Sequence, residues 1–439
     1  MNISARELAQ VTGGVLSGAT SVTVSGIITD SRSSGAGSGV VFIALRGPNH
    51  DGHMFIDLLY ARGVRLFLVD TVPSGAATMA GAAFVKVSDT LVALQKLALW
   101  HRNGFPGKVI AVTGSAGKTV VKEWLAVVMS TAASVIRSPR SYNSQVGVPL
   151  SIMNIGDQHE VAIIEAGISR PGEMQRLADM IRPDTVIITN IGDAHGENFS
   201  GREEIAAEKI RLARGAGMII CSADNEIIMK EAASLHPPAT LYTWSLSGAR
   251  ATLMAGICRS ETTGQCLQCR TEDSTFNALI PFADRASAEN ALSVISCCLA
   301  EGMPVEFIVN AVKTLPAVAM RMEMKDGING CTLIEDYYNS DPSSLGMAVD
   351  FLRNHARGKT TLILSDFRQI GGDENNLYEG VASAVRDAHI DRFIGIGEAL
   401  SRQRDRFQSG SLFFNSTSEF AEAFRSYSFH ERKQAMASL

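Results

Sequence analysis

The sequence lacks long apolar runs and an excess of positive charge. No stretch of about eighteen apolar residues occurs, and the opening MNISARELAQ lacks the basic and then apolar order of a secretion signal. The 40 Lys and Arg stand against 45 Asp and Glu, so no broad cationic surface is available for nucleic acid. These absences predict a soluble, cytoplasmic protein that neither inserts into a membrane nor binds nucleic acid.

A disulfide framework is also lacking. The seven cysteines are odd in number and irregular in spacing, which favours reduced thiols in a chain long enough to fold without cross-links. Cys266 and Cys269 form a C-x-x-C pair, but only Cys258 lies near in sequence as a possible third ligand, whereas structural zinc needs four. The pair is therefore half a site, which disfavours a metal or redox role.

What is present is the composition of a packed globular protein, with 46% hydrophobic and 19% charged residues over 439 positions. At roughly 150 residues per domain, this length favours three domains. The Gly- and Pro-containing segment HRNGFPGK (101–108) suggests the first boundary. We predict domains at 1–102, 103–317 and 318–439.

The hydrophobic pattern favours an α/β fold throughout. The first domain has a helix-like segment at Ser4 to Thr12 and strand-like runs at 40–45 and 64–70. In the central domain, apolar strands alternate with helical patterns, which predicts βαβ units, a mostly parallel sheet and ligands at the carboxyl ends of its strands. In the central domain, we expect strands at 109–114, 161–167 and 185–192 and a closing helix at 287–303. In the last domain, we expect strands at 332–338, 360–366 and 392–398.

The strongest local signal is VIAVTGSAGKTVVKEWLAVVM, in which a buried strand leads through a glycine loop into a helix. Such a loop cradles phosphates with its backbone N–H groups, while Lys118 reaches the terminal phosphates and the Thr119 hydroxyl binds Mg²⁺. The general pattern wants glycine at position 112, where this chain has Val112. The alternative is that this segment is a glycine-rich turn in a protein that binds no nucleotide. The predicted core-facing side of the helix comprises Val121, Trp124, Leu125, Val128 and Met129.

Three further residues are candidates for the same site. Glu165 and His195 each follow a strand of the predicted sheet, where a carboxylate and an imidazole can hold a divalent ion beside phosphate oxygens. Taken alone, a residue of either type is more often a surface or packing residue. Lys209 shares a helical face with apolar residues, so it either extends its amine to solvent or carries a modified or acid-paired amine.

Several motifs in their order resemble the Mur ligases. They are TGSAGKT, YNSQVGVPLS (142–151), IEAG, NIGDAH with GREEIAAEK, and SAENAL, spread over residues 113–292. TDSR (29–32), VVFIALRG and DGHMFI resemble the UDP-binding domain of the two later ligases of that pathway, and IEDYYNSDPSS (334–344) is similar to a motif of the C-terminal domain, with Asp341 where Asn is usual.

The resemblance implies a central P-loop ATPase domain, a C-terminal Rossmann-like domain, and an ATP- and Mg²⁺-dependent amide-bond ligase. The D-N-P-R signature of the ligase that adds the third amino acid is absent. The S-x-G-K-T loop, Y-N-S-Q-V-G-V-P-L and Y-N-S-D-P instead resemble the ligase that joins D-alanyl-D-alanine to a UDP-muramoyl-tripeptide, and we expect this activity. The implied metal ligands are Thr119 and Glu165 for one Mg²⁺, with His195 and a carbamylated Lys209 for the second.

The resemblance also assigns the substrate contacts. The implied nucleotide-binding residues are Gly114, Ser115, Ala116, Gly117, Lys118, Thr119, Asn290, Arg321, Asp336 and Tyr338, of which Asn290 would contact adenine. Ser31 and Arg32 would lie near the uridine diphosphate, and Asn143 would contact substrate. Lys118, Lys209 and His195 are the expected catalytic residues.

Two departures from the family pattern stand in the last domain. SDFRQIGG (365–372) replaces the usual G-D-M-x-E-L-G, and the usual terminal K-G-S-R is missing. Because a similar ligase occurs fused ahead of an alanine racemase, we expect a monomer that is fused to or paired with such a racemase. The alternatives are the ligase for the third amino acid, a folylpolyglutamate synthase, a P-loop switch or motor, and an inactive UDP-sugar-binding protein.

Overall fold

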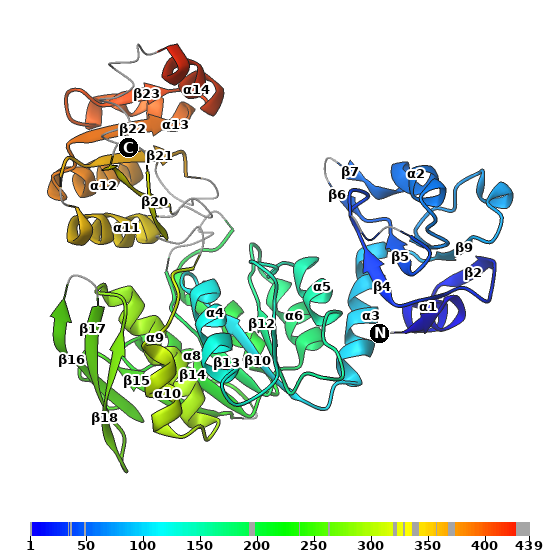
Figure 1. Ribbon diagram of the computed structural model, residues 1–439, viewed down its shortest axis with the longest axis horizontal. Helices are drawn as coiled ribbons and strands as arrows, with labels where there is room; N and C mark the ends of the chain where they lie inside the picture. Colours follow the sequence, from blue (N-terminus) through cyan, green and yellow to red (C-terminus); the bar gives the residue numbers. More distant parts are fainter. Residues whose placement is uncertain are drawn as a thin grey trace.

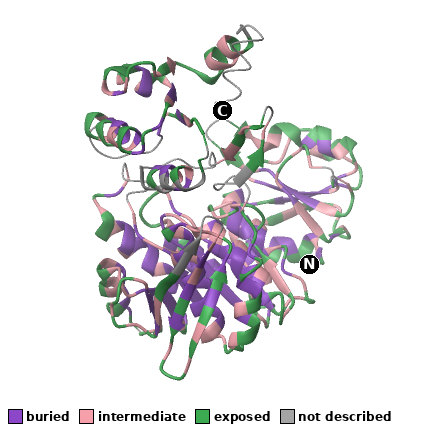
Figure 2. Cartoon of the chain, turned by 60° about the vertical axis from the view of Figure 1, so that its left-hand side comes forward, coloured by how far each residue is buried: buried purple, intermediate pink, exposed green. Residues whose placement is uncertain are grey.

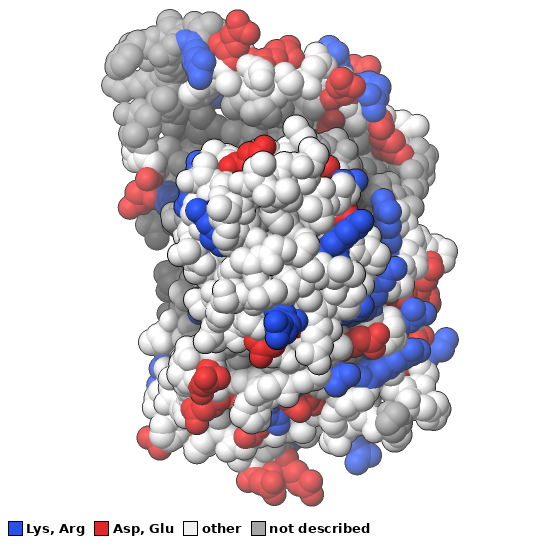
Figure 3. Space-filling model, turned by 90° about the vertical axis from the view of Figure 1, so that its right-hand side faces the viewer, with Lys and Arg blue, Asp and Glu red and all other residues white. Residues whose placement is uncertain are grey.

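The structure is a computed structural model in which three bodies follow one another along the chain (Figure 1). It describes residues 2–33, 35, 37–47, 50–192, 198–236, 238–261, 264–318, 323–327, 330–335, 342–356, 358–367 and 374–426. No helix among these residues is long and apolar enough to cross a membrane. Basic and acidic side chains both occur on the face shown in Figure 3, with broad uncharged areas between them.

The N-terminal body is built on a five-stranded sheet with strand order β2-β9-β8-β5-β4. Its first helix begins where the sequence predicts, because Ser4 and Glu7 form a reciprocal capping box. The strands of this sheet are β2 (Val15–Gly18), β4 (Gly26–Ile28), β5 (Val40–Ile43), β8 (Leu66–Val69) and β9 (Ala83–Lys86). Two short strand pairs lie beside it: β1 (Ile3–Ser4) pairs with β3 (Thr23–Val24), and β6 (Arg46–Gly47) pairs with β7 (His50–Asp51). The helices are α1 (Ala5–Thr12) and α2 (Ile56–Ala61).

Helix α3 (Thr90–Asn103) lies between the N-terminal and central bodies (Figure 1). Leu94 and Leu97 pack in the N-terminal core, whereas Ala98 belongs to the core of the central sheet. Gln95 Nε2 also donates to the backbone oxygen of Gln145 at 3.2 Å. One helix therefore contributes to both cores and ties them together.

The central body is a nine-stranded sheet, β11-β12-β10-β13-β14-β15-β16-β17-β18, parallel from β11 to β16 and antiparallel beyond. This confirms the predicted mostly parallel sheet. The strands are β10 (Lys108–Thr113), β11 (Val135–Arg137), β12 (Val161–Glu165), β13 (Thr185–Ile188), β14 (Met218–Ser222), β15 (Thr240–Ser245), β16 (Leu253–Glu261), β17 (Gly264–Arg270) and β18 (Thr275–Ile280).

Helices cover both faces of this sheet, which is why its interior strands are buried (Figure 2). Along β10, Val109 and Ala111 face one core while Ile110 and Val112 face the other. The first core takes side chains from α5 (Gly147–Ile152), α6 (Glu173–Ile181), α7 (Arg202–Ile210) and α8 (Glu226–Ala233), and the second from α4 (Lys118–Met129), α9 (Arg285–Ala300) and α10 (Val305–Val312).

The C-terminal body contains a parallel sheet, β21-β22-β23. Its elements are α11 (Pro342–His355), β21 (Thr361–Ser365), α12 (Glu374–Asp387), β22 (Arg392–Ile396), α13 (Glu398–Arg402), β23 (Leu412–Phe414) and α14 (Thr417–Ser426). The strand expected at 332–338 does not join this sheet in the described part of the chain. Instead β20 (Thr332–Glu335) pairs antiparallel with β19 (Glu323–Asp326), where Lys325 Nζ lies 2.6 Å from a Glu335 oxygen.

Trp124 is expected to be a major stabilising residue of the central body. All five residues predicted for the buried face of α4 are buried, and the Trp124 ring stacks on Phe282 while its Nε1 donates to the Pro316 carbonyl at 2.9 Å. Trp124→Ala should lower the free energy of unfolding by about 3–5 kcal/mol, measured by urea denaturation followed by circular dichroism. Trp100→Ala is the control, because Trp100 is exposed on α3. Equal losses in the two variants would contradict this packing account.

Candidate active site

The predicted phosphate loop connects β10 to the N-terminus of α4, as the sequence indicates. Gly114 has a φ of +145° and Gly117 a φ of +79°, which side chains rarely adopt. A Cβ on Gly114 would overlap the Thr189 hydroxyl, and one on Gly117 would overlap the side-chain oxygen of Asn290. Both glycines are therefore required by backbone conformation and by close neighbours.

The segment after β13 holds this loop in place, a contact that the sequence analysis missed. Asn190 accepts the Ala116 N–H through its side-chain oxygen at 2.8 Å and the Ser115 N–H through its carbonyl at 3.0 Å. The Thr189 hydroxyl donates to the Ala116 carbonyl at 2.5 Å. The available signal was that Thr189 and Asn190 lie in the run predicted as a strand at 185–192, and residues at the carboxyl ends of parallel strands share one edge of a sheet.

A methyl group at position 114 is expected to disrupt this loop. Gly114→Ala should weaken ADP binding at least about tenfold by calorimetric titration, because the added carbon meets Thr189 and the backbone is strained. Gly172→Ala is the control, because Gly172 also has a positive φ, +82°, but nothing within 4 Å of a Cβ. The control should lose only about 1 kcal/mol of stability and no ADP affinity. Equal ADP affinity in both variants would contradict the loop assignment.

Two lysine amines converge on the carbonyl of Gly114. Lys118 Nζ donates to it at 2.8 Å and to the Ser115 carbonyl at 3.0 Å, while Lys209 Nζ donates to it at 3.0 Å. Lys209 is only 3% exposed, so its amine does not extend to solvent. Burial and the nearby Lys118 hold the pKa of Lys209 well below its usual range, and Glu208 offsets this in part. The predicted proximity of Lys209 to the loop is thus present.

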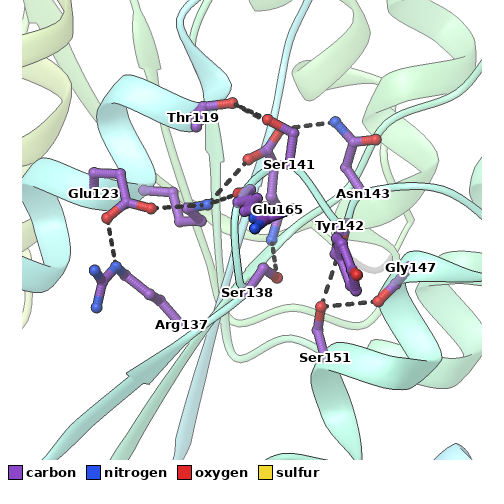
Figure 4. A network of polar contacts seen from close by, with 12 residues as sticks. Thr119, Glu123, Arg137, Ser138, Ser141, Tyr142, Asn143, Gly147, Ser151 and Glu165 are labelled. Atoms are coloured by element: carbon purple, nitrogen blue, oxygen red, sulfur yellow. Dashed lines mark hydrogen bonds and ion pairs between the residues drawn. The ribbon is translucent and has the colours of Figure 1, made fainter. Parts of the chain in front are cut away.

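Glu165, Thr119 and Asn143 form a polar cluster beside the start of α4 (Figure 4). Glu165 Oε1 accepts from the Thr119 hydroxyl at 3.2 Å and from Asn143 Nδ2 at 2.7 Å. The other oxygen, Oε2, is buried and has no hydrogen-bond partner in the described residues. Ser141 lies 3.1 Å from the Thr119 hydroxyl. A buried carboxylate next to a loop hydroxyl is suited to a hard divalent cation.

Lys122 is a second feature that the sequence analysis missed. Its side chain is completely buried on α4, with Nζ 3.0 Å from Glu123 Oε1 and 3.5 Å from Glu165 Oε2. Lys122 follows Lys118 by four residues and Thr119 by three, so helical spacing places it on the side of the loop residues. That spacing was the signal available in the sequence.

The remaining predicted residues are placed as follows. Asn290 on α9 lies against Gly117. Ser31 and Arg32 lie after β4 in the N-terminal body, where the 88% exposed Arg32 pairs with Asp30 and lowers the pKa of that carboxyl to about 2. Predictions for His195, Arg321, Asp336 and Tyr338 fall outside the described residues.

The C-x-x-C pair does not form a metal site in the described part of the chain. Cys266 and Cys269 are three residues apart on β17, so their side chains point to opposite faces of the sheet. All seven cysteines are described, and no disulfide joins any of them. No group of three His, Cys, Asp or Glu side chains suited to a metal ion occurs among the described residues.

The loop does, however, fit a magnesium nucleotide in its choice of residues. Positive-φ glycines leave room for phosphate oxygens, Lys118 supplies a cation, and Thr119 with the Glu165 carboxylate supplies oxygen ligands.

Comparison with known proteins agrees with this site. Residues 112–298 match the model of the Mur ligase middle domain, and residues 320–438 match that of the Mur ligase, glutamate ligase domain. The UDP-N-acetylmuramoyl-tripeptide–D-alanyl-D-alanine ligase of Treponema pallidum is 30% identical over 346 residues, covering 75% of this chain and 72% of that one. The chain belongs to the Mur ligase family. Mur ligases are ATP-dependent amide-bond ligases, and this chain has their three-sheet α/β architecture.

Two further relatives extend the likeness over most of this Mur ligase. The Bacillus subtilis enzyme of the same name is 29% identical over 380 residues, covering 85% of this chain and 80% of that one. A crystal structure of MurF from Acinetobacter baumannii matches with a TM-score of 0.84 and 25% identity, over 97% of this chain and 91% of that one.

Proposed function

We propose that this Mur ligase joins D-alanyl-D-alanine to UDP-N-acetylmuramoyl-tripeptide. The observation that carries the chemistry is the Thr119–Asn143–Glu165 cluster beside the phosphate loop, because it offers an oxygen ligand next to the nucleotide site. The choice of substrates is supported by relatives of that name, which are similar over most of this chain, including its N-terminal body.

The reaction must first activate a carboxylate, because a free carboxylate is a poor electrophile for an amine in water. ATP would transfer its terminal phosphoryl group to the tripeptide carboxylate, forming an acyl phosphate. The amine of D-alanyl-D-alanine would attack the acyl carbon, and the tetrahedral intermediate would expel phosphate. Negative charge develops on the phosphoryl and acyl oxygens, so Lys118 serves to stabilise it.

Thr119 and Glu165 would hold one Mg²⁺, and a carbamylated Lys209 with His195 would hold the second. A bound Mg²⁺ supplies positive charge that neutralises phosphate oxygens. The lowered pKa of the Lys209 amine supports its carbamylation, because the neutral amine is the form that reacts with carbon dioxide. Asn143 donates to Glu165 and thereby orients its carboxylate.

In this proposal, the three bodies contact different parts of the substrates. Ser31 and Arg32 contact the uridine diphosphate, Asn290 contacts adenine, and Arg321, Asp336 and Tyr338 close over the nucleotide. We assign the bodies to domains 1–102, 103–317 and 318–439. Helix α3 crosses the first boundary and packs on both sides of it.

The test is phosphate release by the purified chain with ATP, UDP-N-acetylmuramoyl-tripeptide and D-alanyl-D-alanine. Release should require all three, so omission of each in turn should reduce it to background. A parallel reaction contains UDP-N-acetylmuramoyl-dipeptide with lysine or diaminopimelate. Turnover only in that reaction would replace the proposed function by addition of the third amino acid, and turnover in neither would contradict both.

A further inference from the structure

Lys122 is a buried cation that the proposed chemistry does not use directly. It lies one turn into α4 beyond the loop residues Lys118 and Thr119, and its side chain is 0% exposed. Its amine contacts Glu123 Oε1 at 3.0 Å, Glu165 Oε2 at 3.5 Å and the backbone carbonyl of Arg140. A lysine is almost never fully buried unless its charge is paired, so these contacts need an explanation.

The two carboxylates beside Lys122 differ in whether a second cation compensates their charge. Glu123 is partly exposed, and its Oε2 also pairs with Arg137 Nε at 2.5 Å. Glu165 is completely buried, and Lys122 is the one described cation within ion-pair distance of it. Loss of the lysine charge would therefore leave Glu165, and not Glu123, as an uncompensated buried carboxylate, which is strongly unfavourable.

Lys122 and Thr119 contact different oxygens of Glu165. Glu165 Oε1 lies 3.2 Å from the Thr119 hydroxyl, whereas Lys122 Nζ lies 3.5 Å from Oε2. The amine thus compensates the carboxylate charge through Oε2 and leaves Oε1, beside Thr119, to face the proposed cation.

The same amine also fixes the segment that completes the cluster. It donates to the carbonyl of Arg140, a residue with a φ of +49°, in the segment that carries Ser141 and Asn143 (Figure 4). Ser138, at the start of this segment, accepts the backbone N–H of Glu165 at 3.1 Å. Lys122 therefore connects the loop helix, the Glu165 carboxylate and the residues that orient that carboxylate.

We propose that Lys122 is a positioning residue for the divalent cation, holding Glu165 and the 138–143 segment in place without binding the cation itself. This inference rests on the proposed function, since it takes Glu165 as a metal ligand. Residues that orient a metal ligand from behind typically affect metal affinity by about 10–100-fold.

The test measures Mn²⁺ binding in the presence of ADP, by the loss of the free-ion signal in electron paramagnetic resonance. Mn²⁺ serves as the probe because it shares the oxygen ligands of Mg²⁺. Lys122→Met should weaken Mn²⁺ binding about 10–100-fold. Lys108→Met is the control, because Lys108 also pairs with a largely buried carboxylate, that of Glu301 after α9, but lies at the start of β10, away from the loop. It should leave Mn²⁺ affinity unchanged.

Thermal unfolding of double variants separates positioning from a general packing role. If Lys122 serves Glu165, adding Glu165→Gln to Lys122→Met should recover part of the lost melting temperature, whereas adding Glu123→Gln should not. If Lys122→Met alone does not fold, the test is which of the two double variants folds. Recovery through Glu123→Gln only, or Mn²⁺ affinity equal to wild type in Lys122→Met, would overturn the inference. Failure of the wild-type chain to bind Mn²⁺ with ADP would instead contradict the proposed metal site.

Discussion

Lys118→Ala is expected to lower phosphate release in the complete reaction by at least about 10²–10³-fold. The lysine amine is the loop cation nearest the expected phosphates, and removal of one preorganised charge-stabilising group typically costs this much. Its partners include the carbonyls of Gly114 and Ser115, which an incoming phosphate would replace as the stronger acceptor. The measurement is steady-state phosphate release at saturating concentrations of all three substrates.

The control for this substitution is Lys230→Ala, which removes an exposed lysine from α8. It should leave the rate within twofold of wild type, within the scatter expected for a surface change. The melting temperature of Lys118→Ala should also stay close to wild type, because the Gly114 carbonyl keeps its hydrogen bond from Lys209 and the repulsion between the two amines is removed. Turnover within about tenfold of wild type would mean that the loop does not bind the reacting phosphates.

Residues close together in the sequence made the phosphate loop predictable. Its strand, glycines, lysine and helix lie within 21 consecutive residues, 109–129, so hydrophobic periodicity and glycine positions specify it without tertiary information. The same locality explains the helix start at Ser4, where capping box and apolar pattern agree. The alternation of strands and helices likewise sufficed for the parallel sheet.

Contacts between distant segments were not predictable in this way. Asn190 holds a loop 74 residues earlier in the chain, and Lys122 reaches a carbonyl 18 residues later. The sequence showed Lys122 as an ordinary charged helix position, because only the tertiary fold places Glu165 behind it. Strand β20 was assigned to the wrong sheet for a related reason, since its apolar pattern does not encode which neighbour it pairs with.

The buried amine of Lys209 is expected to lower the stability of the folded chain. The Lys209 amine is buried and pairs with no carboxylate among the described residues, so it is costly to charge, and its lowered pKa reports that cost. Lys209→Met should therefore raise the free energy of unfolding, by on the order of 1 to 4 kcal/mol in buffer free of bicarbonate. The same variant should lower turnover by about 10²–10³-fold, because a proposed metal ligand is lost.

The direction in which the stability gain of Lys209→Met changes with pH follows from the lowered pKa of Lys209. Because the folded-state pKa of Lys209 lies below its unfolded value, the unfolded chain binds more protons between these two values. The stability penalty of the charged amine is complete below the folded pKa and vanishes above the unfolded pKa. The advantage of Lys209→Met, measured by urea denaturation, should thus shrink as the pH rises, and a constant advantage would contradict a buried titrating amine.

Lys209→Ala distinguishes a carbamylated lysine from one that serves only by its charge. Alanine leaves space at the loop, so a short carboxylic acid such as acetate or formate should enter and restore part of the lost turnover, acting as the missing carboxylate. The larger side chain of Lys209→Met should prevent this rescue and serves as the matched control. Rescue by a short amine instead of an acid would mean that Lys209 acts as a cation, beside Lys118 at the Gly114 carbonyl, and not as a metal ligand.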